Sequence, residues 1–202
     1  MLFKTESIAP LELYRLLVGG IIPRPIAWVS TQNSAGLSNL APYSFFSVAS
    51  CNPPVLTITN VVSQSKVAKD TLNNLLQTKE CVVNIVSASQ IEEMNQTCAA
   101  YPDKQSEIDE IGVATVASQT VGPLSVKGSA VRYECKLRET ITLSEQPMGG
   151  VLILLDVVAI SVDETVMTDG VISADLLDSV GKLGGNDYCN AKSDLTLLRP
   201  EL

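Results

Sequence analysis

The sequence contains no histidine, and this absence excludes several kinds of catalytic site. A Ser-His-Asp triad, a histidine general base and a histidine metal ligand all need the imidazole group, which titrates near neutral pH. Aromatic residues are also scarce, at 4% of the 202 residues. Hydrophobic residues nevertheless reach 46% and charged residues 18%, which is the balance of a folded chain and not of a disordered one. At this length we expect one domain with a core of its own.

Long apolar runs and an excess of basic residues are missing too. The longest apolar candidate, residues 151–160, is interrupted by Asp156, which argues against a membrane span. Glu6 and Pro10 fall where a signal peptide needs its apolar segment. Asp and Glu number 22 against 14 Lys and Arg, and the net charge of −8 disfavours nucleic acid as a partner. We therefore expect a cytoplasmic protein that binds neither a membrane nor nucleic acid.

The cysteines are odd in number, and no two of them have the C-x-x-C spacing of a zinc site or a redox dithiol. The five are Cys51, Cys81, Cys98, Cys135 and Cys189. We expect them to be free thiols that act as small hydrophobic residues in a reducing compartment, and we expect no metal site.

Apolar and turn residues predict strands with a few short helices between them. Leucine spacing predicts helices over residues 9–18 and from Asp70 onward, and Ser89 with Glu92 forms a capping box for another. Asp169-Gly170 is a hairpin turn signal. Strands are expected over residues 26–31, 37–50, 55–62, 81–87, 131–143 and 151–162. Because regular β-α-β alternation is absent, a mainly antiparallel barrel or sandwich fits best.

Two side-chain patterns refine this expectation. Alternation over residues 131–143 predicts a strand with one apolar and one wet face, and Glu134 falls on the wet face. Trp28 is the only tryptophan, and we expect it in the core.

Two polar stretches are candidates for binding an anion or a ring that carries carbonyl and nitrogen atoms. Ser30-Thr31 ends one predicted strand, and residues 39–44 concentrate amides and hydroxyls on the next. Lys66, Lys69, Asp70 and Thr71 stand at the start of a predicted helix, where free N–H groups and the helix dipole attract phosphate. Each stretch also has a plainer interpretation, as a hairpin with hydroxyl side chains and as an ordinary solvated helix start.

A third stretch, Gly181 to Tyr188, reads GKLGGNDY. Its G-x-x-G-G spacing differs from the G-x-G-x-x-G of a dinucleotide fold, and no β-α unit flanks it, so a Rossmann fold is set aside. The glycines allow close backbone approach, and the plainer interpretation is a loop that packs on the barrel.

Taken in order, the segments PRPIAWVST, NLAPYSFF, NPP, KDTLNN, CVVNIVS and GKLGGNDY resemble the flavin reductase-like family of FMN-binding split-barrel proteins. The resemblance covers Ile22 to about Pro200. It implies a mainly β fold, an antiparallel split β-barrel with a few short helices. Residues 1–202 would form a single FMN-binding domain in which residues 1–21 are an N-terminal helical extension. It also implies a homodimer with FMN near the subunit interface.

The resemblance also assigns residues to the FMN site. Positions expected near the phosphate are Ser30, Thr31, Lys69 and Thr71. The strand expected to line the ribityl chain and the ring edge contributes Asn39, Ala41, Pro42, Tyr43 and Ser44. Further matching positions are Arg24, Leu183, Gly184 and Tyr188, while Cys189 stands where the family often has alanine.

The function that the resemblance implies is hydride transfer from NADH or NADPH to flavin. That chemistry occurs at flavin N5 and needs no catalytic residue, so it suits a chain without histidine. Backbone N–H groups of residues 39–44 are expected to hydrogen-bond the ring. Two alternatives remain open: a flavoredoxin-like electron-transfer protein that exchanges electrons with a redox protein partner, and a flavin-binding module without catalysis.

Overall fold

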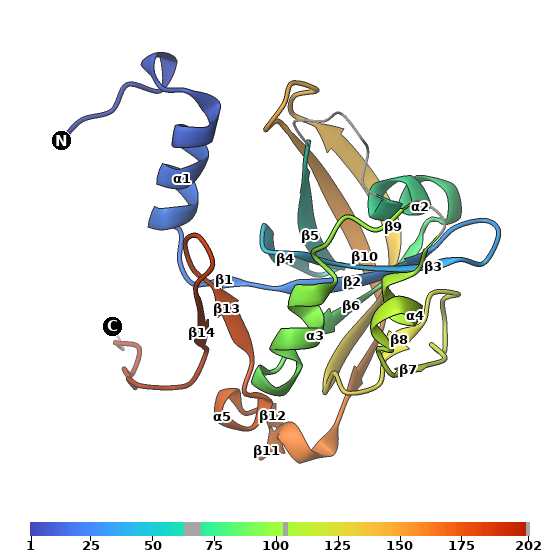
Figure 1. Ribbon diagram of the computed structural model, residues 1–202. Helices are drawn as coiled ribbons and strands as arrows, with labels where there is room; N and C mark the ends of the chain where they lie inside the picture. Colours follow the sequence, from blue (N-terminus) through green and yellow to red (C-terminus); the bar gives the residue numbers. More distant parts are fainter. Residues whose placement is uncertain (63–69, 103–104, 201–202) are drawn as a thin grey trace.

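The computed structural model describes residues 1–62, 70–102 and 105–200. Its largest sheet has seven strands in the order β3-β2-β6-β9-β10-β5-β4, and every neighbouring pair is antiparallel. The strands are β2 (Ala27–Gln32), β3 (Ser38–Tyr43), β4 (Phe46–Cys51), β5 (Pro54–Val61), β6 (Glu80–Ile85), β9 (Val131–Thr142) and β10 (Gly150–Val162). The predicted mainly β, antiparallel fold is confirmed (Figure 1).

The barrel closes because one predicted strand is broken in two. β3 and β4 are consecutive in the chain, with only Ser44 and Phe45 between them, yet they stand at opposite ends of the sheet. β3 pairs with β2, and β4 pairs with β5. The continuous strand expected over residues 37–50 is therefore wrong in one respect. A single segment that pairs with both ends of a sheet must bend, and the bend falls at these two residues.

Alternating side chains of β2 divide the core into two clusters. Val29 faces the barrel interior, where it packs with residues such as Ile58 and Leu155. Trp28 faces the other way, is fully buried, and packs with Met94. Its Nε1 donates a hydrogen bond to Thr97 Oγ1 at 3.0 Å. The expected core position of Trp28 is therefore confirmed.

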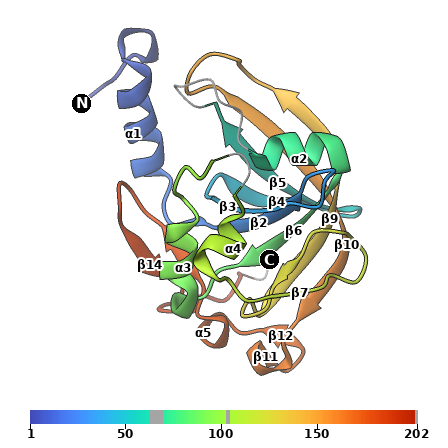
Figure 2. The same cartoon turned by 45° about the vertical axis from the view of Figure 1, so that its right-hand side comes forward.

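Short helices surround the barrel (Figure 2). They are α1 (Pro10–Gly20), α2 (Asp70–Thr78), α3 (Ile91–Gln96), α4 (Glu107–Ile111) and α5 (Ala174–Leu177), with 3-10 turns η1 (Thr5–Ser7), η2 (Ala88–Gln90) and η3 (Glu164–Val166). α2 packs against the barrel through the buried Leu75, whereas α1 stands away from the barrel in every ribbon view. Within the described ranges, no helix has the length and hydropathy needed to cross a membrane.

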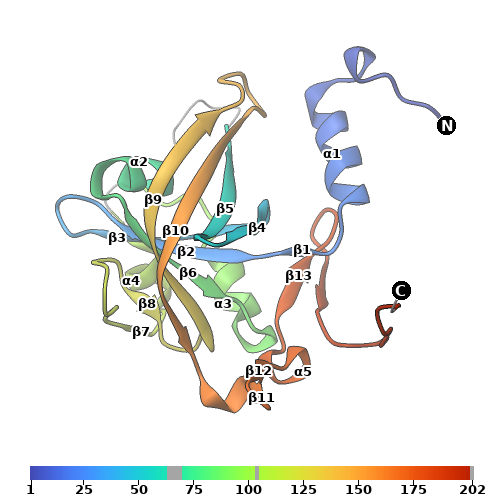
Figure 3. The ribbon, with the colours of Figure 1, turned by 180° about the vertical axis from the view of Figure 1, so that it is seen from behind.

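Smaller sheets extend the barrel. β1 (Arg24–Pro25), β13 (Val180–Lys182) and β14 (Tyr188–Asn190) form one sheet, in the order β1-β13-β14. It brings the GKLGGNDY segment beside the RP dipeptide, as Figure 3 shows from behind. β11 (Met167–Thr168) and β12 (Val171–Ile172) form the hairpin predicted from Asp169-Gly170. The last pair is β7 (Thr115–Val116) with β8 (Ser125–Val126).

Two local predictions fail for identifiable reasons. The capping box is wrong, because Gln90 precedes α3 without a side-chain cap, and Ser89 Oγ lies 2.9 Å from Ser87 Oγ instead. Glu134 is buried and not on a wet face, because the chain around Thr120 folds over that end of β9 and hydrogen-bonds its carboxylate.

Candidate functional site

The predicted site residues fall into two groups at opposite ends of β3. At the first end Asn39 Nδ2 donates to Thr71 Oγ1 at 2.9 Å and approaches Thr31 Oγ1 at 3.4 Å. Asn74, on the next turn of α2, donates to Thr31 Oγ1 at 3.1 Å. Two strand ends and the start of α2 therefore meet, as the sequence predicts.

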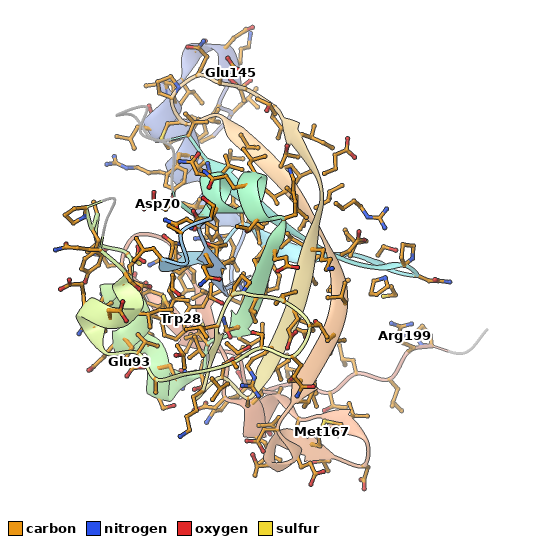
Figure 4. All side chains as sticks on the ribbon, turned by 90° about the vertical axis from the view of Figure 1, so that its right-hand side faces the viewer. Trp28, Asp70, Glu93, Glu145, Met167 and Arg199 are labelled. Atoms are coloured by element: carbon orange, nitrogen blue, oxygen red, sulfur yellow. The ribbon has the colours of Figure 1, made fainter. Side chains whose placement is uncertain are left out.

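This first group is closed to solvent. Thr31, Asn39, Thr71 and Asn74 are all buried, and their side chains hydrogen-bond one another. Lys66 and Lys69, predicted at the same helix start, lie outside the described residues, so the expected phosphate contact of Lys69 stays a prediction. Figure 4 marks Asp70 at the start of α2, well above Trp28.

Ser30 does not join this group. Its hydroxyl donates to the carbonyl oxygen of Leu124 at 2.5 Å. Successive side chains of a strand face opposite sides, so the hydroxyls of Ser30 and Thr31 lie on opposite faces of β2. Their expected place near the phosphate stays a prediction.

A carboxyl group and a phenol lie near the first group, and the sequence predicted only the phenol, that of Tyr43, as a site residue. Glu107 of α4 accepts a hydrogen bond from the Leu40 N–H at 3.0 Å, and burial raises the pKa of its carboxyl. Burial also raises the pKa of Tyr43, although a hydrogen bond with Thr71 acts the other way. Only the tertiary structure places Glu107 here, because α4 is a five-residue helix far along the chain.

The Leu40–Glu107 bond limits what the β3 backbone can offer a ligand. β3 is an end strand of the sheet, so alternate N–H groups face away from β2. Glu107 takes the outward N–H of Leu40, and Pro42 has none. Over residues 39–43 of β3, alternation therefore leaves no outward backbone N–H free for a ligand.

At the second end of β3, two cavities adjoin. The first, which we call the α1 cavity, has a volume of about 240 Å³, and the second, the Tyr188 cavity, about 120 Å³. Ser44 and Lys182 line both, so the cavities share a wall. The α1 cavity is lined by Leu11, Tyr14, Arg15, Val18, Arg24, Ser44, Lys182, Leu183, Gly184 and Gly185. The Tyr188 cavity is lined by Ile26, Pro42, Ser44, Met94, Cys98, Lys182 and Tyr188.

Six of the predicted residues line these cavities. They are Arg24, Pro42, Ser44, Leu183, Gly184 and Tyr188. Strand alternation explains the division of β3: Pro42 and Ser44 face the cavities, whereas Ala41 and Tyr43 pack into the barrel interior. A separate apolar cavity of about 290 Å³, beside Pro25 and Tyr133, contains none of the predicted residues.

Arg24 ties three segments together at the α1 cavity. It is 6% exposed, and its Nη1 donates to the carbonyl oxygens of Val18 and Ile21 at 2.5 and 2.7 Å. Its Nη2 donates to the carbonyl oxygen of Leu183 at 2.8 Å. The end of α1 and the loop after β13 are therefore both held by this guanidinium.

Lys182 stands between the two cavities. Its Nζ donates to the carbonyl oxygens of Gly185 and Asp187 at 2.7 and 3.3 Å, and lies 3.9 Å from the centre of the Tyr188 ring. Burial and the charge of Arg24 lower the pKa of Lys182, and the carboxylate of Asp187 acts in the opposite direction. Sequence reasoning considered this segment for its glycines and missed the lysine.

Tyr188 forms the far wall. Its hydroxyl donates to Asn95 Oδ1 of α3 at 3.3 Å, and burial raises the pKa of the phenol. The arrangement joins apolar and aromatic walls to a lysine and two arginines. Such a mixture of apolar walls with a few polar and charged groups is typical of a small-molecule site.

Comparison with known proteins shows the family of the chain. Residues 19–180 match the flavin reductase like domain. The chain is 35% identical over 203 residues to the uncharacterized protein YwrF of Bacillus subtilis, covering 98% of each. The structure of nitrilotriacetate monooxygenase component B from Bacillus cereus is 31% identical, with a TM-score of 0.91 and 98% of each chain covered. That of 2-nitrobenzoate 2-nitroreductase NbaA from Pseudomonas fluorescens is 28% identical, with a TM-score of 0.87 over 99% of this chain and 96% of that one. The resemblance read from the motifs is thereby confirmed: the chain belongs to the flavin reductase like domain family.

Proposed function

We propose that this protein binds FMN and acts as an NAD(P)H-dependent, flavin reductase-like oxidoreductase that transfers hydride from a nicotinamide to flavin. Its family membership supports a flavin-related redox function. The observation that carries the finer proposal is the pair of adjoining cavities at the end of β3, lined by six residues that the family motifs had singled out.

The residues present fit a flavin. Ile26, Pro42 and Met94 give the Tyr188 cavity apolar walls, and Tyr188 adds an aromatic one. Ser44 and Lys182 supply polar groups at its edge. Along β3 the phosphate would lie toward the start of α2, where Lys69 is proposed to add its charge. Thr71 is buried at that helix start and bonded to Asn39, so we propose that it holds this end of the site in shape.

When bound, the flavin supplies N5, the atom that accepts the hydride. The chain's own residues would bind the flavin, orient it and shield it from water. The ammonium of Lys182, which lines the Tyr188 cavity, would stabilise negative charge that arrives there. Met94 and Ile26, both buried, keep water from one side of that cavity.

Two measurements test the proposal. The purified protein is titrated with FMN and its visible spectrum recorded, and the loaded protein is mixed with NADH or NADPH in a stopped-flow instrument. We expect saturable FMN binding and bleaching of the flavin band. Absence of FMN binding overturns the proposal entirely. Flavin that binds but reacts only with an electron-donor protein replaces it with the flavoredoxin-like function, and flavin inert to both leaves a binding module.

The same proposal covers assembly. We propose that residues 1–202 form one domain with residues 1–21 as a helical extension, and that the protein is a cytoplasmic homodimer. Exposed leucines on α1, which stands off the barrel, support association: Leu11, Leu16 and Leu17 are 45%, 40% and 52% exposed.

A further inference from the structure

We propose that the α1 cavity is a phosphate-binding subsite, in which Arg15, Arg24 and Lys182 hold the diphosphate of the reduced nicotinamide dinucleotide. This inference rests on the proposed function, because it takes a dinucleotide as the hydride donor. It assigns a task to Arg15 and Lys182, neither of which was singled out from the sequence.

The charge of the cavity is the first argument. Among the residues that the structure describes, three basic ones line it and no acidic one does, although acidic residues outnumber basic ones by 22 to 14 in the chain. The ion pairs of the described ranges use Lys136, Arg138 and Lys192, and none uses a cation of this cavity. A cavity whose described charged residues are all cations, in an acidic protein, favours an anionic ligand.

The guanidinium of Arg24 is the second argument. It is almost fully buried, and the groups that its Nη atoms meet are neutral carbonyl oxygens. Its Nε has no hydrogen-bond partner among the residues that the structure describes. Holding the end of α1 explains the Nη contacts but leaves the charge of this buried group without a counter-ion.

Lys182 supplies the third argument. Its ammonium shares the cavity with Arg24, and the repulsion between the two, together with burial, lowers the pKa of Lys182. Asp187 offsets only part of this effect. An anion bound between the two cations would offset the electrostatic repulsion between them, so the repulsion favours binding of an anion.

The position of the cavity selects the ligand. The flavin phosphate is proposed at the Thr71 end of β3, whereas the α1 cavity lies at the Ser44 end. It adjoins the Tyr188 cavity, where the flavin ring is proposed, through Ser44 and Lys182. A hydride donor must lie against that ring, so the phosphates nearest to this cavity belong to the second ligand and not to the flavin.

The test uses ADP-ribose, which carries the diphosphate but no nicotinamide, titrated by calorimetry into the FMN-loaded protein. We expect Lys182→Met to weaken binding by about tenfold or more, the usual loss for one charge-assisted hydrogen bond. Arg15 is exposed, so Arg15→Gln should weaken binding by only about threefold. Lys127→Met is the matched control, because Lys127 is an exposed lysine that does not line the cavity, and it should leave the affinity unchanged.

The outcomes separate this inference from the proposed function. No ADP-ribose binding, or equal affinity in all variants, overturns the subsite even if NADH or NADPH reduces the flavin. If Arg15→Gln weakens FMN but neither riboflavin nor ADP-ribose, the cavity holds the flavin phosphate and the inference is wrong. If the two variants weaken ADP-ribose while no hydride transfer occurs, the subsite stands and the proposed hydride transfer fails.

Discussion

At the scale of one residue, Glu134 is a buried carboxylate that stabilises the folded state through hydrogen bonds. Its Oε1 accepts from the Gln119 N–H at 2.9 Å, and its Oε2 accepts from the N–H and hydroxyl of Thr120 at 2.6 and 2.5 Å. Burial alone would raise the pKa of Glu134, but these hydrogen bonds lower it below the ordinary 4.5. The charged form is therefore preferred in the folded state.

The predicted consequence is a pH-dependent loss in Glu134→Gln. A lowered pKa in the folded state adds stability above the pKa of the unfolded chain, and that stability is lost as the pH falls through the folded value. At pH 7 we expect the free energy of unfolding of the variant to be about 1–3 kcal/mol lower than that of the wild type. The N–H₂ group of glutamine would face N–H donors there, where the carboxylate oxygen accepted their hydrogen bonds. Urea unfolding of both proteins should show this gap shrinking below about pH 4. A gap that stays constant with pH contradicts the assigned role.

The pairing of Cys81 with Cys135 could not be predicted from residue spacing. They stand far apart in the chain and share no motif, and both are free and buried as expected of small hydrophobic residues. Yet β6 and β9 place them directly opposite each other. Strand pairing joins residues without regard to their separation in sequence. Spacing alone therefore predicted that these cysteines are free thiols, but not that they lie opposite each other.

At the scale of elements, α1 is held within one chain by few contacts, among them the Arg24 hydrogen bonds and a ring contact between Tyr14 and Phe45. Among the described hydrogen bonds between side chain and backbone, those that reach α1 and the residue after it come from Arg24. The helix buries only Val18, so apolar packing contributes little to holding it within one chain.

Arg24→Met should therefore loosen α1 without disturbing the barrel. We expect the free energy of local opening over residues 10–20 to fall by about 2 kcal/mol, because two charge-assisted bonds are lost. Hydrogen exchange followed by mass spectrometry measures it, with β2 and β9 as internal references. Arg138→Met, which breaks an exposed pair with Asp156, is the control and should leave α1 unchanged. Uniformly faster exchange would instead mean that Arg24 stabilises the whole fold.

At the scale of the whole molecule, exposed apolar side chains lie on barrel strands, as at Val48 and Ile160, and also on α1 and the extended C-terminal segment. Leu17 on α1 is 52% exposed, and the extended C-terminal segment exposes Leu195, Leu197 and Leu198 at 86%, 90% and 92%. Such side chains are costly to leave in water on a single chain, and a second copy would cover them.

We accordingly predict a solution mass of twice the chain mass of 21.5 kDa. Leu17→Glu should shift the protein toward 21.5 kDa in light scattering, because it places a charge in the proposed interface. Val171→Glu, on the hairpin of β11 and β12, is the control: Val171 is even more exposed, at 68%, and the change should leave the mass unchanged. A wild-type mass of a single chain would rule out the dimer.

The sequence by itself determined the antiparallel, mainly β class, the core position of Trp28 and the family, because alternation, turn residues and ordered motifs are local signals. It also indicated that Asn39, Thr31 and Thr71 meet. Only the tertiary structure decided that this meeting is closed, and that the open cavities lie at the Ser44 end of β3. Arg15, Glu107 and Lys182 had no sequence signal, since their places depend on where α1, α4 and β13 lie beside the end strand β3. The physical reason is that burial and charge depend on which segments the barrel brings together.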